Sequence, residues 1–208
     1  MRVFGWEVEG AVPEAPRYVV IAAPHTTNWD LPFMLAVAYT MGFDPSWVGK
    51  HTLFEGPRGR FFRWLGGVPV NRSSRRDQVQ QIVDHIHSVE KIALAIAPEG
   101  TRMRRKYWKS GFYYIALRAE VPIALGYLDY KRKRGGIGPV FMPSGDLEAD
   151  CALIRNFYAG VTGKHPEQFN NIAFRPEGEG VERPPRRGGL SAFLHGVGIL
   201  RARGARSG

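Results

Sequence analysis

The sequence predicts an α/β fold in which a mostly parallel central sheet is flanked by helices. Between residues 18 and 130, short runs of β-branched and apolar residues alternate with longer segments of helical pattern. This alternation is typical of parallel strands joined by helices. One run, residues 91–97, is almost continuously apolar, as expected for a strand covered on both faces.

The elements can be assigned in order along the chain. Residues 1–17 hold two prolines and are expected to form an arm or edge strand leading into the first core strand. The predicted strands are 18–23, 46–50, 66–72, 91–97 and 121–130, and the predicted helices are 31–41, 59–65, 75–90 and 109–120. Helix 31–41 is apolar all round, and we therefore expect it to be buried. Residues 134–183 are assigned only to further fold.

Length and composition limit the organisation and the partners. A chain of 208 residues suits one domain, here residues 1–182, followed by a basic tail or amphipathic helix at 183–208. The formal net charge of +10 indicates an acidic partner, which could be nucleic acid, an anionic membrane or a phosphorylated substrate. Cys151 is the single cysteine and is expected to pack in the core. Since no apolar stretch approaches about 20 residues and no signal peptide is recognisable, we expect neither secretion nor a membrane span.

A base and a carboxylate, His25 and Asp30, lie between the first core strand and the apolar helix. On a regular helix, side chains five positions apart diverge by about 140°, so a helix could not pair them. A turn that opens into a helix could let the Asp30 carboxylate hold one imidazole nitrogen while the other accepts a proton. Alternatively, Asp30 only caps the helix, with Pro32 in its first turn.

Further polar candidates also follow predicted strands, namely Lys50, Arg72 and the segment 99–102. Ligands of parallel sheets bind outside the carboxyl ends of the strands, so these groups are expected to share a site with His25. The arginines suit phosphate through bidentate bonds and Lys50 suits it as a point charge, while Gly100 permits a close approach of the backbone. Alternatively, each arginine is a solvated surface charge. Without a candidate nucleophile or a Gly-x-Ser-x-Gly elbow beside His25, the pattern favours a general base acting on a hydroxyl group.

Four blocks of the sequence, in matching order and separation, resemble those of the glycerolipid acyltransferases. The first is the His-x4-Asp (HX4D) block formed by His25 and Asp30. The others are Gly67 to Arg72, Glu99-Gly100-Thr101-Arg102 and Val121-Pro122-Ile123. Lys50 resembles the lysine of a short family motif after the second strand. The chain is thereby identified as similar to the 1-acylglycerol-3-phosphate acyltransferase family.

This resemblance implies a glycerol-3-phosphate acyltransferase-like layered fold and transfer of a fatty acyl group from acyl-CoA or acyl-ACP to a lysolipid hydroxyl. The expected acceptor is 1-acylglycerol-3-phosphate, and the alternative is a non-phosphatidate lipid. His25 would act as general base, oriented by Asp30, without a covalent intermediate. The residues implied in substrate binding are Lys50, Arg72, Glu99, Gly100, Thr101 and Arg102, with the two arginines on the phosphate. No metal or bound cofactor is implied.

The chain also departs from the family pattern. Pro24 stands where the family usually has Asn, and the long membrane-seeking N-terminal helices of many members have no counterpart. Contact with an anionic membrane is therefore expected from residues 58–65 or from 190–200, since 183–208 carry six arginines and no acid. A disordered basic tail is the alternative. We expect a cytoplasmic enzyme, peripheral on the inner face of the cell membrane.

Two other functional classes fit less well. A basic nucleic-acid-binding protein would use arginines and aromatic residues, but here arginines accompany a His/Asp pair and no known binding motif is found. We therefore expect no nucleic acid partner. A metal-dependent phosphoesterase needs several converging carboxylates, and the motifs supply only Asp30 and Glu99.

Overall fold

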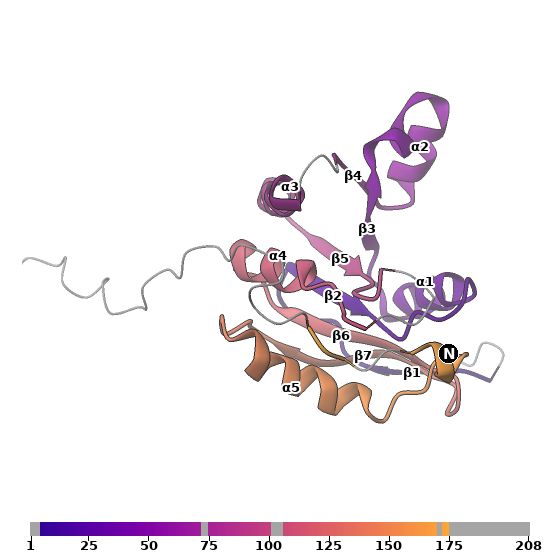
Figure 1. Cartoon of the computed structure of the whole chain (residues 1–208). Coiled ribbons are helices and arrows are strands. Elements are labelled where there is room, and N and C mark those ends of the chain that lie inside the picture. Colours follow the sequence, from indigo (N-terminus) through magenta and orange to yellow (C-terminus); the bar gives the residue numbers. More distant parts are fainter. Residues whose placement is uncertain (1–4, 72–74, 101–105, 170–171, 175–208) are drawn as a thin grey trace, which may run out of the picture. The chain divides into compact units, whose positions relative to one another are not determined.

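One sheet organises the part of the chain that the computed structural model describes, residues 5–71, 75–100, 106–169 and 172–174 (Figure 1). Within these residues the sheet has seven strands in the order β1-β7-β6-β2-β5-β3-β4. The strands are β1 Glu7–Gly10, β2 Arg17–Ala22, β3 Pro45–Lys50, β4 Gly67–Val70, β5 Ile92–Ile96, β6 Ile123–Asp129 and β7 Arg134–Phe141. The helices are α1 Asp30–Met41, α2 Gly56–Trp64, α3 Arg75–Ser88, α4 Gly111–Ala119 and α5 Leu147–Tyr158, with short 3₁₀ turns η1 His51–Phe54 and η2 Pro166–Gln168.

The sheet is mostly parallel, which confirms the predicted fold class. Strands β6, β2, β5, β3 and β4 run in one direction. The hairpin partner of β6, strand β7, runs antiparallel to it, and the edge strand β1 pairs parallel to β7. The five parallel strands therefore have their carboxyl ends at the same edge of the sheet, where the residues after β2, β3, β5 and β6 come together.

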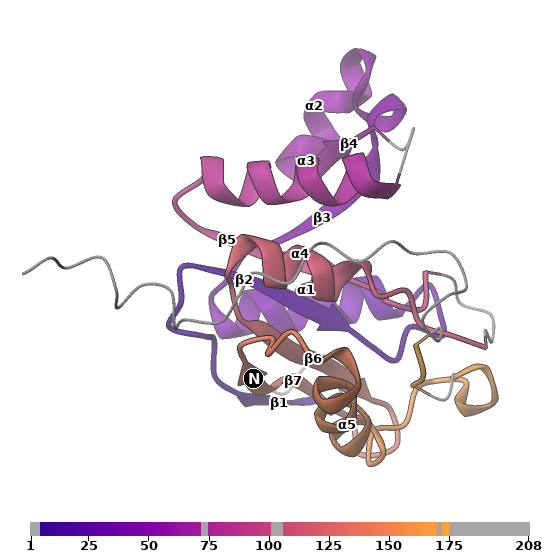
Figure 2. The same cartoon turned by 60° about the vertical axis from the view of Figure 1, so that its left-hand side comes forward.

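Helices cover the two faces of the sheet, and alternate residues of β2 show how the core is divided. Val19 and Ile21 are fully buried in a core shared with residues of α3, α4 and α5. Val20 points to the opposite face, where it packs with Met41 and Phe43 at the end of α1. In the view of Figure 2, α1 lies behind β2, and α4 and α5 lie in front of the sheet.

Helix α1 is less buried than its apolar composition predicts, so that expectation was wrong. Its inner side lies on the sheet, but Leu31, Leu35 and Tyr39 are exposed, Tyr39 to 82%. A helix that packs on one face of a sheet buries only one stripe of its surface. Because every side of α1 is apolar, the sequence pattern could not show which stripe that would be.

Strand β7 and helix α5 lie in the region that sequence patterns left unassigned. Three glycines interrupt β7, at 135, 136 and 138, and glycine weakens a strand signal. Gly136 is required by the pairing of β1, since a Cβ atom there would lie 1.9 Å from the carbonyl oxygen of Glu9. In α5, Cys151 is fully buried, as predicted, and burial raises the pKa of its thiol to about 11.

The proposed division of the chain at residue 182 falls outside the described residues, as does the whole basic segment 183–208. Among the helices that are described, none is both long and apolar enough to cross a membrane.

Candidate active site

The loop between β2 and α1 is wound around the side chain of Asp30. The backbone N–H groups of Thr26 and Thr27 donate to Asp30 Oδ2 at 2.8 and 2.9 Å. His25 Nδ1 lies 3.3 Å from the same oxygen. The chain doubles back between a strand end and a helix start, and this brings the two side chains together, as in the first of the two alternatives that the sequence left open. Their catalytic role stays a prediction.

The Asp30 carboxylate is fully buried, and both of its oxygens accept hydrogen bonds. Its second oxygen, Oδ1, accepts a hydrogen bond of 2.8 Å from Tyr130 Oη, at the end of β6. Burial is the largest influence on this carboxyl group and by itself would raise its pKa. The hydrogen bonds from His25, Thr27, Tyr130 and Thr26 together outweigh burial and lower the pKa below its ordinary value. Asp30 is therefore an anion at neutral pH.

This anion determines which nitrogen of His25 carries the proton. An ionised carboxylate only accepts hydrogen bonds, so Nδ1 must be the protonated nitrogen of the neutral ring. The other nitrogen, Nε2, is left with a free lone pair, and the side chain is 27% exposed. A substrate hydroxyl that reaches the ring would thus meet a proton acceptor.

The alternative that Asp30 only caps α1 does not fit the hydrogen bonds. The residue at the N-cap is Trp29, and it makes no side-chain cap bond. The Asp30 carboxylate accepts from the upstream loop and from Tyr130. It holds the loop against the sheet edge.

Glu99 reaches the same loop from the neighbouring strand β5. It is 2% exposed, and its Oε1 accepts a hydrogen bond of 3.1 Å from the backbone N–H of His25. Burial is the main cause that raises its pKa to about 7, and the negative charge of Asp30 adds to this, whereas the His25 hydrogen bond and charge oppose it. Glu99 therefore positions His25, and its expected role in acceptor binding stays a prediction.

The remaining predicted residues lie at the same sheet edge or outside the described part. Gly100 has a φ of +64°, a backbone conformation that glycine adopts without strain and that other residues rarely adopt. Lys50 ends β3 and is exposed. Three predicted substrate-binding residues lie outside the described residues: Arg72, Thr101 and Arg102.

Sequence reasoning missed Tyr130 and the segment 162–165. Tyr130 is held in place by its backbone N–H, which donates to Thr162 O at 2.9 Å, and by ring contacts with Trp6 and Phe33. From the same segment, the N–H of His165 donates to Thr26 Oγ1 at 3.2 Å. The available signal for Tyr130 was its place at a strand end on the same edge as His25.

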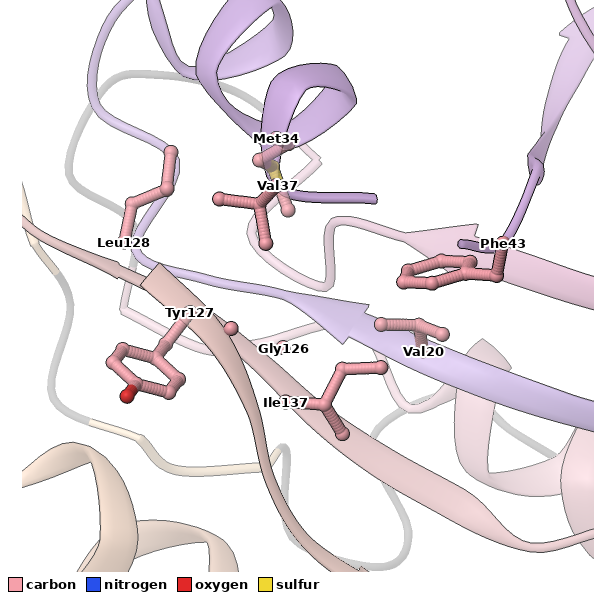
Figure 3. A pocket seen from close by; sticks show the side chains of 9 residues that line it. Val20, Met34, Val37, Phe43, Gly126, Tyr127, Leu128 and Ile137 are labelled. Atoms are coloured by element: carbon pink, nitrogen blue, oxygen red, sulfur yellow. The ribbon is translucent and has the colours of Figure 1, made fainter. Parts of the chain in front are cut away.

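A small apolar pocket of about 30 Å³ lies between α1 and the sheet (Figure 3). Its lining includes Met34 and Val37 of α1, above Val20 and Leu128 of the sheet. Met34 is one helical turn after Asp30. Across the described ranges, no group of three or more His, Cys, Asp or Glu side chains is placed to hold a metal ion.

Comparison with known proteins gives two matches. A family model described as Acyltransferase matches residues 6–124. The chain is also similar to the crystal structure of the 1-acyl-sn-glycerophosphate (LPA) acyltransferase PlsC from Thermotoga maritima, with 20% sequence identity and a TM-score of 0.51. That match covers 67% of this chain and 62% of PlsC, so the chain spans less than two thirds of PlsC. At this identity the similarity shows a shared fold. No curated protein matches the chain.

Tyr130→Phe removes one hydrogen-bond donor from the Asp30 carboxylate. It should thereby alter the interaction between Asp30 and His25 without changing either residue. We expect kcat to fall about tenfold with little change in KM, as for a lost charge-assisted bond. A carboxyl group whose pKa is lowered on folding loses its stabilising effect as pH falls through that pKa. Without the Tyr130 bond the Asp30 pKa rises, so the acid limb of the kcat profile should move to higher pH.

The matched control is Tyr127→Phe, which removes a hydroxyl of the same strand that donates to Glu9 Oε2 at 2.8 Å. An unshifted acid limb in Tyr130→Phe, or an equal shift in Tyr127→Phe, would show that Tyr130 does not act through Asp30.

Glu99 should make the stability of the fold depend on pH with a sign opposite to that of Asp30. Because its pKa rises from 4.5 in the unfolded chain to about 7 on folding, the folded state binds the proton more tightly, and stability should fall as pH rises between these values. The expected loss is roughly 2 to 3 kcal/mol. Glu99→Gln keeps an acceptor for the His25 N–H without the titration. Denaturant unfolding across this pH range should show the loss in the wild type and a nearly flat curve in Glu99→Gln; parallel curves would contradict the assignment.

Proposed function

This chain belongs to the acyltransferase family, and on that premise we propose that it moves a fatty acyl group from acyl-CoA or acyl-ACP to the hydroxyl of a lysolipid. The observation that carries the proposal is the His25–Asp30 pair, in which Asp30 holds Nδ1 and Nε2 is left free to accept a proton. The proposed acceptor is 1-acylglycerol-3-phosphate, the substrate class named for PlsC.

The reaction needs one proton acceptor and no covalent enzyme intermediate. His25 Nε2 takes the proton of the acceptor hydroxyl while the oxygen attacks the thioester carbonyl. The new C–O bond forms, the C–S bond breaks, and the imidazolium returns its proton to the departing thiolate. The Asp30 anion stabilises the imidazolium between these steps. General base catalysis of this kind is worth about 10²- to 10⁴-fold.

Binding of the acceptor is assigned to cationic side chains that the sequence predicts for this site. Arg72 and Arg102 would bind the phosphate bidentately, with Lys50 as a further positive charge. Gly100 and Thr101 would border the same space. Backbone N–H groups near His25 would stabilise the oxyanion of the tetrahedral intermediate. The proposal includes no metal and no bound cofactor.

The acyl chain of the donor needs an apolar site close to His25. The pocket beneath α1 is lined by apolar side chains and begins about one helical turn from Asp30 (Figure 3). Its volume of about 30 Å³ is close to that of one water molecule, so α1 would have to move away from the sheet for part of the acyl chain to enter. Since the acceptor is a lipid, the enzyme would work as a peripheral protein on the inner, cytoplasmic face of the cell membrane, without a nucleic acid partner.

The proposal is tested by acyl transfer from a labelled acyl thioester to a panel of lysolipids, with lysophosphatidate and non-phosphatidate acceptors side by side. His25→Ala should reduce transfer by about 10²- to 10⁴-fold, and a chelator should leave the wild-type rate unchanged. His85→Ala, a histidine of α3, is the matched control and should retain wild-type activity.

Absence of transfer to every lipid tested, or equal rates for His25→Ala and the wild type, would contradict the proposal. Transfer that requires His25 but favours a non-phosphatidate lipid would keep the reaction and change the acceptor.

A further inference from the structure

The outward side of α2 and η1 exposes four large apolar side chains. Trp64 is 79% and Phe61 56% exposed, and Leu53 and Leu65 are also exposed. Phe61 lies three residues before Trp64 and four before Leu65, so these side chains share one side of the helix. Contiguous apolar groups on a protein surface indicate a contact with a partner or a membrane.

Positive charges border these apolar residues. Arg58 lies three residues before Phe61, and Arg60 lies four before Trp64, so each is a neighbour of the apolar group on the helix surface. Both arginines are exposed, and the sequence contains no acidic residue between Glu55 and Asp77. We call this set, Leu53, Arg58, Arg60, Phe61, Trp64 and Leu65, the α2 face.

The inner side of α2 holds the helix in place. Phe54 is buried against Trp47 and Phe62, with ring centroids 5.9 and 6.2 Å away. Trp47 Nε1 also donates to Leu65 O at 2.8 Å, and Arg63 donates to Phe54 O at 3.2 Å. These contacts fix the helix through side chains other than Trp64. The Phe61 ring lies 5.8 Å from the Phe62 ring, so replacing Phe61 removes one ring contact with the inner side.

Helix α2 begins near the sheet edge that carries the candidate active site and runs back along the sheet, so that Leu65 lies beside Trp47 in the first half of β3. Helix α2 follows η1 at the carboxyl end of β3, and β3 is two strands from β2, which leads to His25. Neighbouring strands are about 4.8 Å apart, so the axes of β2 and β3 are about 10 Å apart. Figures 1 and 2 both show α2 next to β4.

We propose that the α2 face is the surface with which the protein docks on an anionic phospholipid bilayer. Trp, Phe and Leu side chains enter the headgroup region, while flanking arginines extend their guanidinium groups to anionic lipids. The importance of this contact for catalysis rests on the proposed function, because a lysolipid acceptor lies in the bilayer.

Arginines next to aromatic rings also occur in proteins that bind single-stranded nucleic acid, where bases stack on the rings. The composition of the α2 face favours the bilayer. Leu53 and Leu65 add aliphatic surface, which gains by entering a lipid phase but offers no ring for a base to stack on.

The test is cosedimentation of the full chain with vesicles of phosphatidylcholine alone and of phosphatidylcholine mixed with phosphatidylglycerol. The wild type should bind the anionic vesicles at least about tenfold more tightly than the neutral ones. Phe61→Ser/Trp64→Ser and Arg58→Ser/Arg60→Ser should each weaken anionic binding by roughly tenfold or more. Met142→Ser/Leu153→Ser is the matched control, since it removes two apolar side chains, 56% and 53% exposed, from elsewhere on the surface, and should bind like the wild type.

Failure of the wild type to bind anionic vesicles, or equal binding by the α2 variants, would overturn the proposal. So would displacement of the protein from vesicles by a single-stranded oligonucleotide through these same residues. Sedimentation measures no acyl transfer, so the docking result is independent of the catalytic one. Transfer to an acceptor dissolved as monomers should remain at the wild-type rate in Phe61→Ser/Trp64→Ser, and a loss there would also count against a docking role.

Discussion

The buried carboxylate of Asp30 has to be satisfied by hydrogen bonds, because a charge removed from water without partners costs several kcal/mol. Its donors are the amides of Thr26 and Thr27, the His25 ring and the Tyr130 hydroxyl. The first three donors belong to the loop that the carboxylate holds in place, and the fourth, Tyr130, lies 100 residues further along the chain. The same hydrogen bonds orient the His25 ring. They thereby set the position of Nε2, the nitrogen that accepts the proton in the proposed reaction.

The sheet supplies the frame in which this network forms. Because β2, β5 and β6 are parallel neighbours, their carboxyl ends bring His25, Glu99 and Tyr130 to one edge. Glu99 fixes the backbone of His25 on one side and Tyr130 fixes its partner Asp30 on the other. The chain leaves the same edge at the end of β3 and forms α2, which exposes aromatic and basic side chains.

The sequence was sufficient for the strands and helices up to residue 130 and for the His25–Asp30 pair, because apolar periodicity and strand-end polarity are local signals. It was insufficient for β7, where glycines needed for strand pairing interrupt the pattern. Which side of α1 is buried could not be predicted, because the helix is apolar on every side. Tyr130 was missed because its contact with Asp30 depends on tertiary structure, and the positioning role of Glu99 was missed because its bond is to a backbone N–H. Arg72, Thr101 and Arg102 lie outside the described residues.

The most direct test of the account is the tautomer of His25, measured by ¹⁵N NMR of labelled protein in alkaline buffer and compared with Asp30→Asn. We expect a protonated Nδ1 and an unprotonated Nε2 in the wild type, and a change in this preference when Asp30 is replaced. A wild-type ring with its proton on Nε2, or a ring whose tautomer does not respond to Asp30→Asn, would contradict the claim that Asp30 prepares His25 to act as a base.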